Sequence, residues 1–197
     1  MLRQSYTINK IEAGIDEAGR GALAGPVVAA AVIFPKDFKN SDLNDSKKLS
    51  RNTRYDLEKI IKKKSIAFSI GMVSAKEIDK INILNASFLA MHKAITNLTI
   101  RPELLLIDGN RFHQYKGITH KCIIKGDNKF LSIAAASIIA KNYRDEFMKK
   151  IDVNNTYNWE KNKGYPTKEH RSIIQRVGFS DQHRKSFQLL KNQIKLF

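Results

Sequence analysis

The stretch Ile15-Asp16-Glu17-Ala18-Gly19-Arg20-Gly21 joins two apolar runs, residues 10–16 and 26–34. Both runs have the length of a strand, and the short connection between them favours an antiparallel hairpin. Two adjacent carboxylates at the end of an apolar strand repel each other unless a cation lies nearby. A turn with glycine on both sides of an arginine lets backbone amides and a guanidinium group approach a phosphate closely. The stretch therefore predicts a hairpin that carries a metal-assisted site for a phosphodiester.

The patterns that follow predict an α/β fold with a mixed sheet. Further strands are expected at residues 67–73, 103–107 and 121–125. Helices are expected from the N-cap residue Ser50 to residue 62, along an apolar stripe from Ile81 to Leu98, and over residues 132–151. No strand pattern occurs after residue 151. We expect a catalytic domain at residues 1–151 and a basic helical C-terminal extension, residues 152–197, packed on it.

Composition narrows the class of protein. The chain has 197 residues, about one domain, and a formal net charge of +16, which indicates a polyanionic partner such as nucleic acid. An AT-rich genome, which favours lysine codons, is the alternative explanation of the charge. A single cysteine, Cys122, cannot form an internal disulfide. The first ten residues lack the apolar segment of a signal peptide, and no run is long enough to span a membrane. We expect a soluble cytoplasmic protein with no membrane contact.

Four acids occupy comparable places in the predicted sheet. Asp16 and Glu17 end the first strand, Asp108 ends the fourth, and Asp127 follows the fifth. Sites in open α/β sheets gather outside strand ends, so these acids are expected to converge. Carboxylate oxygens suit Mg²⁺ or Mn²⁺, and two such ions can activate a water and stabilise the leaving oxygen of a phosphodiester. Taken singly, Asp108 and Asp127 are better explained as turn residues, and only the combination of the four acids indicates a site.

Six segments of this chain resemble bacterial ribonuclease HII. In order they read GIDEAGRGALAGPVVAAAVI, LNDSKKLS, LLIDGN, KGDNKFLSIAAASIIAKNYRD, NKGYPTKEH and HRKSF, and the resemblance runs from about Ile11 to Leu190. The chain departs from the usual family pattern at Asn128 and at Phe130-Leu131, which concerns the loop beside Asp127. The six segments occur in the order and at the spacing expected of that family, which makes the resemblance specific.

The resemblance implies a ribonuclease H-like mixed five-stranded sheet flanked by helices, with a helical C-terminal extension. It implies metal-dependent cleavage of RNA in RNA–DNA hybrids and cleavage 5′ to ribonucleotides embedded in duplex DNA. The products would carry 3′-hydroxyl and 5′-phosphate ends. The cofactor would be Mg²⁺ or Mn²⁺, with two ions during catalysis, and the roles would be ribonucleotide removal from DNA and RNA primer removal.

The resemblance also assigns residues to roles. The catalytic and metal-binding acids would be Asp16, Glu17, Asp108 and Asp127. The substrate-binding residues would be Gly19, Arg20 and Gly21 at the ribonucleotide's 2′-hydroxyl, Tyr165 at the ribose, and Ser46, Lys47 and Lys48 at the backbone. A 2′-hydroxyl is the group by which a protein distinguishes RNA from DNA at one position. Lysine side chains at phosphates would set affinity and salt dependence without specificity.

Several of these residues have simpler explanations. Tyr165 could brace the turn before Pro166, and Lys47 and Lys48 could belong to a solvated surface. His170 and His183 lack the spacing of metal ligands and are interpreted as structural residues or phosphate contacts, and Trp159 as a packing residue. Two other functions stay open: another nuclease or strand-transfer enzyme of the ribonuclease H fold, and a non-catalytic nucleic-acid-binding module.

The last five residues, Gln193-Ile194-Lys195-Leu196-Phe197, look like the short peptides by which bacterial repair proteins dock on the replication sliding clamp. A Leu-Phe pair on a mobile tail is a suitable hydrophobic anchor for a pocket. The alternative is the end of an amphipathic helix that folds back on the domain.

Overall fold

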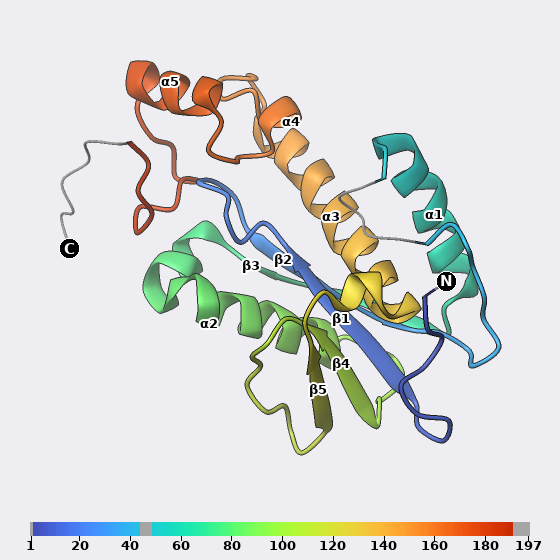
Figure 1. The fold of residues 1–197 in the computed structure, drawn as a ribbon. Helices are drawn as coiled ribbons and strands as arrows, with labels where there is room; N and C mark the ends of the chain where they lie inside the picture. The colour runs from blue at the N-terminus through green and yellow to red at the C-terminus, as the bar shows by residue number, and fades with distance from the viewer. Residues whose placement is uncertain (1, 44–48, 191–197) are drawn as a thin grey trace.

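The computed structural model describes residues 2–43 and 49–190 and contains one five-stranded sheet with helices on both faces (Figure 1). Strand order across the sheet is β3-β2-β1-β4-β5. The elements are, in chain order, β1 (Glu12–Ala18), β2 (Val27–Ile33), α1 (Arg51–Lys64), β3 (Ala67–Val73), α2 (Ala75–Thr96), β4 (Leu104–Asp108), β5 (Thr119–Ile123), a short 3₁₀ helix (Gly126–Asn128), α3 (Leu131–Ile151), α4 (Trp159–Asn162) and α5 (Lys168–Val177).

The sheet is mixed, as the sequence predicts. Strand β2 pairs antiparallel with β1 and with β3, whereas β4 lies parallel to β1 and β5 parallel to β4. The expected β1–β2 hairpin is therefore confirmed. Because β1 and β4 run in the same direction side by side, residues at their carboxyl ends meet at one edge of the sheet.

Two hydrophobic clusters, one on each face of the sheet, share strand β2, whose seven residues are all buried. Its alternate side chains Val27, Ala29, Ala31 and Ile33 pack with α2, and Val28, Ala30 and Val32 pack with α1 and α3. Figure 1 shows α2 on one face of the sheet and α1 and α3 on the other. A strand that is apolar on both faces is expected wherever helices cover both sides of a sheet.

Helix α3 lies very close to β1. A Cβ atom added to Gly14 would lie 2.2 Å from the carbonyl carbon of Ser132 and 2.4 Å from the amide nitrogen of Ile133. Any side chain at position 14 would therefore push the first turn of α3 away from the strand. This contact places α3 directly over the part of β1 that carries Asp16.

Helix caps explain where α1 and α2 begin. The hydroxyl of Ser50 accepts a hydrogen bond from the Thr53 amide, which confirms Ser50 as the N-cap of α1. Helix α2 starts at Ala75, ahead of the apolar stripe that begins at Ile81, because Ser74 and Glu77 form a capping box. The stripe begins beside a kink, where Asn82 has a φ of 64° and its side chain caps the second part of the helix.

The described part of the C-terminal extension, residues 152–190, contains α4 and α5 and no strand longer than an isolated bridge between His183 and Ala24. Its main chain forms hydrogen bonds with the loop after β1. The Gly164 carbonyl accepts hydrogen bonds from the amides of Leu23 and Ala24, and the Gly25 amide donates to Gln182. Figure 1 shows α4 and α5 at the end of the sheet where β1 enters this loop.

Candidate active site

The register between β1 and β4 brings two of the predicted acids to the same edge of the sheet. Ile15 pairs with Ile107, and the next residues along the two parallel strands are Asp16 and Asp108. Asp16 is 5% exposed and lies within β1, two residues before its end, while Asp108 is the last residue of β4 and half-buried. Residues 92 positions apart in the chain are thus neighbours in the sheet.

The three acids at this edge affect each other's ionisation. Burial, followed by the negative charges of Glu17 and Asp108, raises the pKa of Asp16 well above its usual value. Hydrogen bonds from Ser137 and from the Glu17 amide oppose that shift. Burial also raises the pKa of Glu17, against the opposing charge of Arg20. Negative charge at this edge is therefore unfavourable in the protein alone.

Asp127 lies in the 3₁₀ turn that follows β5 and is 4% exposed. The turn is attached to the β4 acid, because the Gly126 amide donates a 2.7 Å hydrogen bond to Oδ1 of Asp108. The departure from the family pattern at Asn128 has a local consequence, since its side-chain amide donates to Oδ1 of Asp127 at 3.3 Å. The 3₁₀ turn that carries Asp127 is thus attached to the β4 acid through the neighbouring residue Gly126.

The donor set at this edge fits a hard divalent cation. It consists of carboxylate oxygens, and Oε2 of Glu17 is buried without a hydrogen-bond partner among the described residues. Within residues 2–43 and 49–190, no group of three or more His, Cys, Asp or Glu side chains is arranged to hold a metal ion by itself. This arrangement suits Mg²⁺, which keeps several waters and shares its coordination between one or two carboxylates and substrate phosphates.

The glycine-arginine-glycine turn begins immediately after β1. Gly19 has a φ of +96° and backs onto Arg144, so that an added Cβ would lie 2.0 Å from Nε of that arginine. The side chain of Arg20 is 52% exposed and forms a 3.1 Å ion pair with Glu17. The turn thus holds its guanidinium group between the buried acids and solvent.

The fold requires glycine at position 19 but not at position 21. The φ of Gly21 lies outside the left-handed region, and an added Cβ would meet nothing within 4 Å. The residue is exposed. Since the fold leaves room for a side chain here, the open space at Gly21 is available to a ligand that approaches the backbone closely.

Tyr165 lies beside this turn. It follows Gly164, whose carbonyl holds the amides of Leu23 and Ala24. The half-buried tyrosine ring faces two cations, with Lys141 Nζ at 5.5 Å and Arg144 Cζ at 5.3 Å from its centroid. Arg144 therefore lies against both Gly19 of the turn and the ring of Tyr165, two predicted site residues that are far apart in the chain.

Two residues at this site carry no signal in the sequence. Arg144 of α3 and Arg184 of the extension are both 0% exposed, and both donate hydrogen bonds to carbonyls of the loop after β1. In a chain with a net charge of +16, two further arginines are indistinguishable from surface cations. Only their occurrence in the segments KNYRD and HRKSF could have drawn attention to them.

His170 and His183 form a buried network, which excludes the phosphate-contact interpretation and supports the structural one. They are 0% and 1% exposed, and their Nε2 atoms lie 3.2 Å apart. Nδ1 of His183 accepts from the Ser180 amide, and Nε2 of His170 accepts from the Trp159 indole. Both rings are therefore neutral, with Nε2 of His183 donating to His170. Trp159, 2% exposed, is a packing residue as predicted.

This network predicts a loss of stability in acid. Burial, followed by the repulsion that a second protonated ring at His170 would cause, lowers the pKa of His183 to about 4 from the usual 6.5. The unfolded chain therefore binds a proton that the folded protein excludes, so this stabilisation is complete above pH 6.5 and declines as the pH falls towards 4. We expect the stability advantage of the wild type over His183→Gln to shrink over that interval by on the order of 3 kcal/mol, measured by urea unfolding. His113→Gln, at an exposed position, serves as control; a constant advantage would contradict the assignment.

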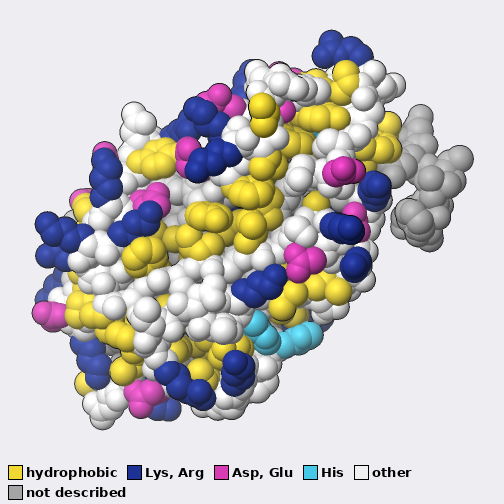
Figure 2. Space-filling view, turned by 180° about the vertical axis from the view of Figure 1, so that it is seen from behind, with side chains coloured by type: hydrophobic (Ala, Val, Ile, Leu, Met, Phe, Trp, Pro, Cys, Tyr) yellow, Lys and Arg dark blue, Asp and Glu magenta, His cyan; other side chains and the backbone are white. Residues whose placement is uncertain are grey.

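The predicted backbone contacts Ser46, Lys47 and Lys48 lie outside the described residues, as does the predicted docking peptide Gln193 to Phe197. Their roles stay predictions. The described surface carries many cations without one continuous basic patch on the face shown in Figure 2, where Lys and Arg side chains alternate with apolar and acidic ones.

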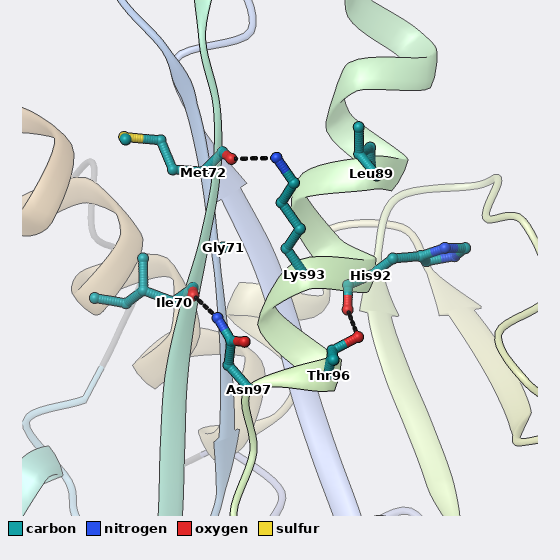
Figure 3. Close-up of a pocket in the computed structure, with 8 residues that line it drawn as sticks. All are labelled: Ile70, Gly71, Met72, Leu89, His92, Lys93, Thr96 and Asn97. Atoms are coloured by element: carbon teal, nitrogen blue, oxygen red, sulfur yellow. Dashed lines mark hydrogen bonds between the residues drawn. The ribbon is translucent and has the colours of Figure 1, made fainter. Parts of the chain in front are cut away.

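A shallow pocket lies away from the acids, between edge strand β3 and α2 (Figure 3). Its polar side chains are directed at the strand: Lys93 Nζ donates to the Met72 carbonyl at 3.1 Å and Asn97 Nδ2 to the Ile70 carbonyl at 2.9 Å. These bonds occupy acceptors that a foreign strand would otherwise pair with. The pocket is therefore explained as protection of the sheet edge.

The comparisons with known proteins agree with each other. The family model described as Ribonuclease HII matches residues 13–190. A Ribonuclease HII of Parabacteroides distasonis is 58% identical over 197 residues, which covers 100% of this chain and 99% of that protein. No helix in the described part of this chain is long and apolar enough to cross a membrane.

Two solved structures share the fold. The PCNA:RNase HII complex from Archaeoglobus fulgidus aligns with a TM-score of 0.76 at 24% identity, over 95% of this chain and 100% of that one. Bst-RNase HIII in complex with Mn²⁺ aligns with a TM-score of 0.62 at 18% identity, over 85% of this chain and 63% of that one.

Proposed function

The chain belongs to the ribonuclease HII family, and from that membership we propose how its residues divide the work of cutting and of choosing the cut. It is an endonuclease with the ribonuclease H-like fold, and it cleaves RNA in RNA–DNA hybrids. The proposal extends the substrate to duplex DNA that contains single ribonucleotides, cleaved on their 5′ side to leave 3′-hydroxyl and 5′-phosphate ends. Its role is then ribonucleotide removal from DNA and RNA primer removal, in the cytoplasm.

The cofactor is Mg²⁺ or Mn²⁺, held by Asp16, Glu17, Asp108 and Asp127. When bound, two such ions lower the pKa of an attacking water and stabilise the departing 3′-oxygen. The raised pKa of Asp16 supports this assignment, because three acids packed at one sheet edge are stable as anions only beside a cation. The Mn²⁺ bound by Bst-RNase HIII, a protein of the same fold, agrees with a divalent cation here.

The chain's own groups position these acids. Ser137 and the Glu17 amide hold the Asp16 carboxylate, and the Gly126 amide holds that of Asp108 at 2.7 Å. Both acids therefore keep fixed orientations before any substrate arrives, which reduces the reorganisation needed during the reaction.

Selection of the cut belongs to the turn and the tyrosine. The amides of Arg20 and Gly21 and the guanidinium group of Arg20 supply donors for the 2′-hydroxyl and the neighbouring phosphate. The Tyr165 ring supplies an apolar surface beneath the ribose or base. The observation that supports this proposal is the attachment of the tyrosine segment to the loop just after the turn, where the Gly164 carbonyl accepts hydrogen bonds from the amides of Leu23 and Ala24.

A nicking assay tests the proposal. The substrate is an end-labelled DNA duplex with one ribonucleotide, compared with the all-DNA duplex of the same sequence, with and without Mg²⁺. We expect one nick 5′ to the ribonucleotide, in the presence of Mg²⁺ only, with a product that polymerase can extend from its 3′-hydroxyl. Equal cleavage of both duplexes, or cleavage without a divalent cation, would contradict the proposed selectivity or the proposed cofactor.

The two glycines of the turn are expected to respond differently to the same substitution. Gly21→Ala adds a methyl group in open space, so the unfolding temperature should stay unchanged while kcat/KM for the single-ribonucleotide duplex falls about tenfold, as expected for one displaced hydrogen bond. Gly19→Ala should lower the unfolding temperature, because its Cβ would collide with Arg144. Thermal unfolding and nicking rates of both variants check this; equal destabilisation would show that Gly21 is required by the fold.

A partner is proposed for the C-terminal peptide, residues 193–197: the replication sliding clamp. The complex of an archaeal ribonuclease HII with PCNA supports this choice of partner. Deletion of residues 193–197 should abolish binding to the clamp of the same bacterium, measured by surface plasmon resonance, without changing the nicking rate. Undiminished clamp binding by the shortened chain would remove the peptide from the interaction.

A further inference from the structure

Arg184 lies in the HRKSF segment, and its guanidinium group donates hydrogen bonds to main-chain carbonyls of the turn and of the loop that follows it. Its Nη2 donates to the Gly19 carbonyl at 2.8 Å, its Nη1 to the Arg20 carbonyl at 2.9 Å and its Nε to the Gly25 carbonyl at 3.0 Å. Gly19 and Arg20 are two of the three residues of the turn. One buried guanidinium group therefore fixes both peptide units of the glycine-arginine-glycine turn.

No acidic side chain in the described part of the chain forms an ion pair with Arg184. Burial, and then the positive charge of Arg144, lower the pKa of Arg184 to about 9. A buried cation without an ion-pair partner is unfavourable unless it is well hydrogen-bonded, and here each of the three guanidinium nitrogens donates to a main-chain carbonyl. A charge buried at such a cost, with its nitrogens hydrogen-bonded to main-chain carbonyls, indicates that the Arg184 side chain serves to fix the backbone conformation of the turn.

The consequence for the turn follows from peptide geometry. In a trans peptide the carbonyl and the following N–H point in opposite directions. Because Arg184 holds the carbonyls of Gly19 and Arg20, the amides of Arg20 and Gly21 point away from it. Neither amide has an acceptor among residues 2–43 and 49–190, and both residues are exposed. The turn thus presents two free amide donors to the outside.

The segment that carries Arg184 is itself anchored. Asp79 of α2 accepts hydrogen bonds from the amides of Lys185 and Ser186 at 3.0 and 2.9 Å. The Arg184 amide donates to the Leu23 carbonyl at 2.8 Å. Hydrogen bonds to α2 and to the loop after β1 therefore hold the segment that carries Arg184. Through the Arg184 guanidinium group, the position of the C-terminal extension determines the conformation of the turn.

We infer that Arg184 is a positioning residue for ribonucleotide discrimination: it holds the turn so that the Arg20 and Gly21 amides face the 2′-hydroxyl of the substrate. This inference rests on the proposed function and adds a residue to it. Arg184 touches no substrate, and its effect should appear in selectivity before it appears in the cutting step.

The test compares Arg184→Lys with the wild type in the full-length chain. Lysine keeps the positive charge but cannot donate to three carbonyls in the planar pattern of a guanidinium group. The readout is the ratio of kcat/KM on a duplex with one ribonucleotide to kcat/KM on a continuous RNA–DNA hybrid. We expect that ratio to fall about tenfold, the effect of one misplaced hydrogen bond. A second readout, independent of activity, is the pair of amide resonances of Arg20 and Gly21 by NMR, which should shift.

Arg171→Lys is the matched control. Arg171 also belongs to the extension and also donates to main-chain carbonyls, those of Gln188 and Leu189, but not to the turn. Its substitution should leave both the ratio and the two amide resonances unchanged. If Arg184→Lys does not fold at the assay temperature, the same measurements are made on Arg184→Gln, whose side-chain amide can still donate to one of the carbonyls.

The outcomes separate the two claims. A wild type that does not prefer the single-ribonucleotide duplex over all-DNA duplex overturns the proposed function. With that preference present, an unchanged ratio in the folded Arg184 variants overturns the inference. Unshifted Arg20 and Gly21 resonances overturn it as well, because Arg184 then does not set the turn. If the kcat/KM ratio falls equally in Arg184→Lys and in Arg171→Lys, the effect comes from general loosening of the extension, and this result would also overturn the inference.

Discussion

Asp16→Asn is expected to reduce cleavage of both a hybrid and a single-ribonucleotide duplex by about a thousandfold or more. Metal ions contribute several kcal/mol to stabilising the charge of a phosphoryl transition state, and about 4 kcal/mol corresponds to that factor. The same substitution removes a buried negative charge that lies beside Glu17 and Asp108. The variant should therefore unfold in metal-free buffer at a temperature no lower than the wild type, and it should still bind substrate.

Metal binding supplies an activity-independent readout for this variant. An ion present at about 100 times its dissociation constant stabilises the folded state by about 2.7 kcal/mol, which is roughly 5–10 °C in unfolding temperature for a chain of this size. We expect Mn²⁺ to produce that shift in the wild type and little of it in Asp16→Asn. The control Asp37→Asn, at an exposed position, should keep both activity and shift. Near-normal turnover by Asp16→Asn would remove this acid from the mechanism.

Tyr165→Ala is expected to act on the choice of substrate. Loss of an aromatic surface beneath a sugar or base corresponds to about 1–3 kcal/mol, which is roughly 10- to 100-fold in rate. The loss should fall mainly on the duplex with one ribonucleotide, where recognition rests on a single position. A continuous hybrid offers a ribose at every register and should be affected less. Competition between the two substrates in one reaction measures the ratio directly.

Tyr165→Phe separates the ring from the hydroxyl. If the ring carries selection, phenylalanine should keep most of the preference that alanine loses. The ring also lies 5.3 Å from Arg144 Cζ and 5.5 Å from Lys141 Nζ, so thermal unfolding of both variants must accompany the assay. An unchanged substrate ratio in Tyr165→Ala would limit the tyrosine to bracing the turn before Pro166.

The sheet could be predicted because its strands are local patterns. Strand β2 is apolar over its whole length, and the short β1–β2 connection permits an antiparallel hairpin. The helix α2 could be predicted from its apolar stripe, but its first residue could not, because the stripe reports packing and not the capping box at Ser74. The kink at Asn82 also has no counterpart in the periodicity, since it arises from one residue with a positive φ.

Less of the candidate site than of the fold could be predicted from the sequence. Asp16 and Asp108 could be paired in advance because parallel strands bring their carboxyl ends together, and the register shows that pairing. The buried arginines could not be predicted, because a guanidinium group held by main-chain carbonyls leaves no complementary acid in the sequence. Arg144 and Arg184 are such groups, with every donor nitrogen bonded to a carbonyl oxygen.

The central claim is that the acids catalyse cleavage of the phosphodiester, whereas the glycine-arginine-glycine turn and Tyr165 select the cleavage site. The most direct measurement is the single-turnover cleavage rate of wild type, Asp16→Asn and Tyr165→Ala on two substrates, a duplex with one ribonucleotide and a continuous hybrid. The account predicts that Asp16→Asn loses cleavage of both substrates equally and that Tyr165→Ala lowers mainly the rate on the single ribonucleotide. Equal losses on both substrates for both variants would contradict the division of labour.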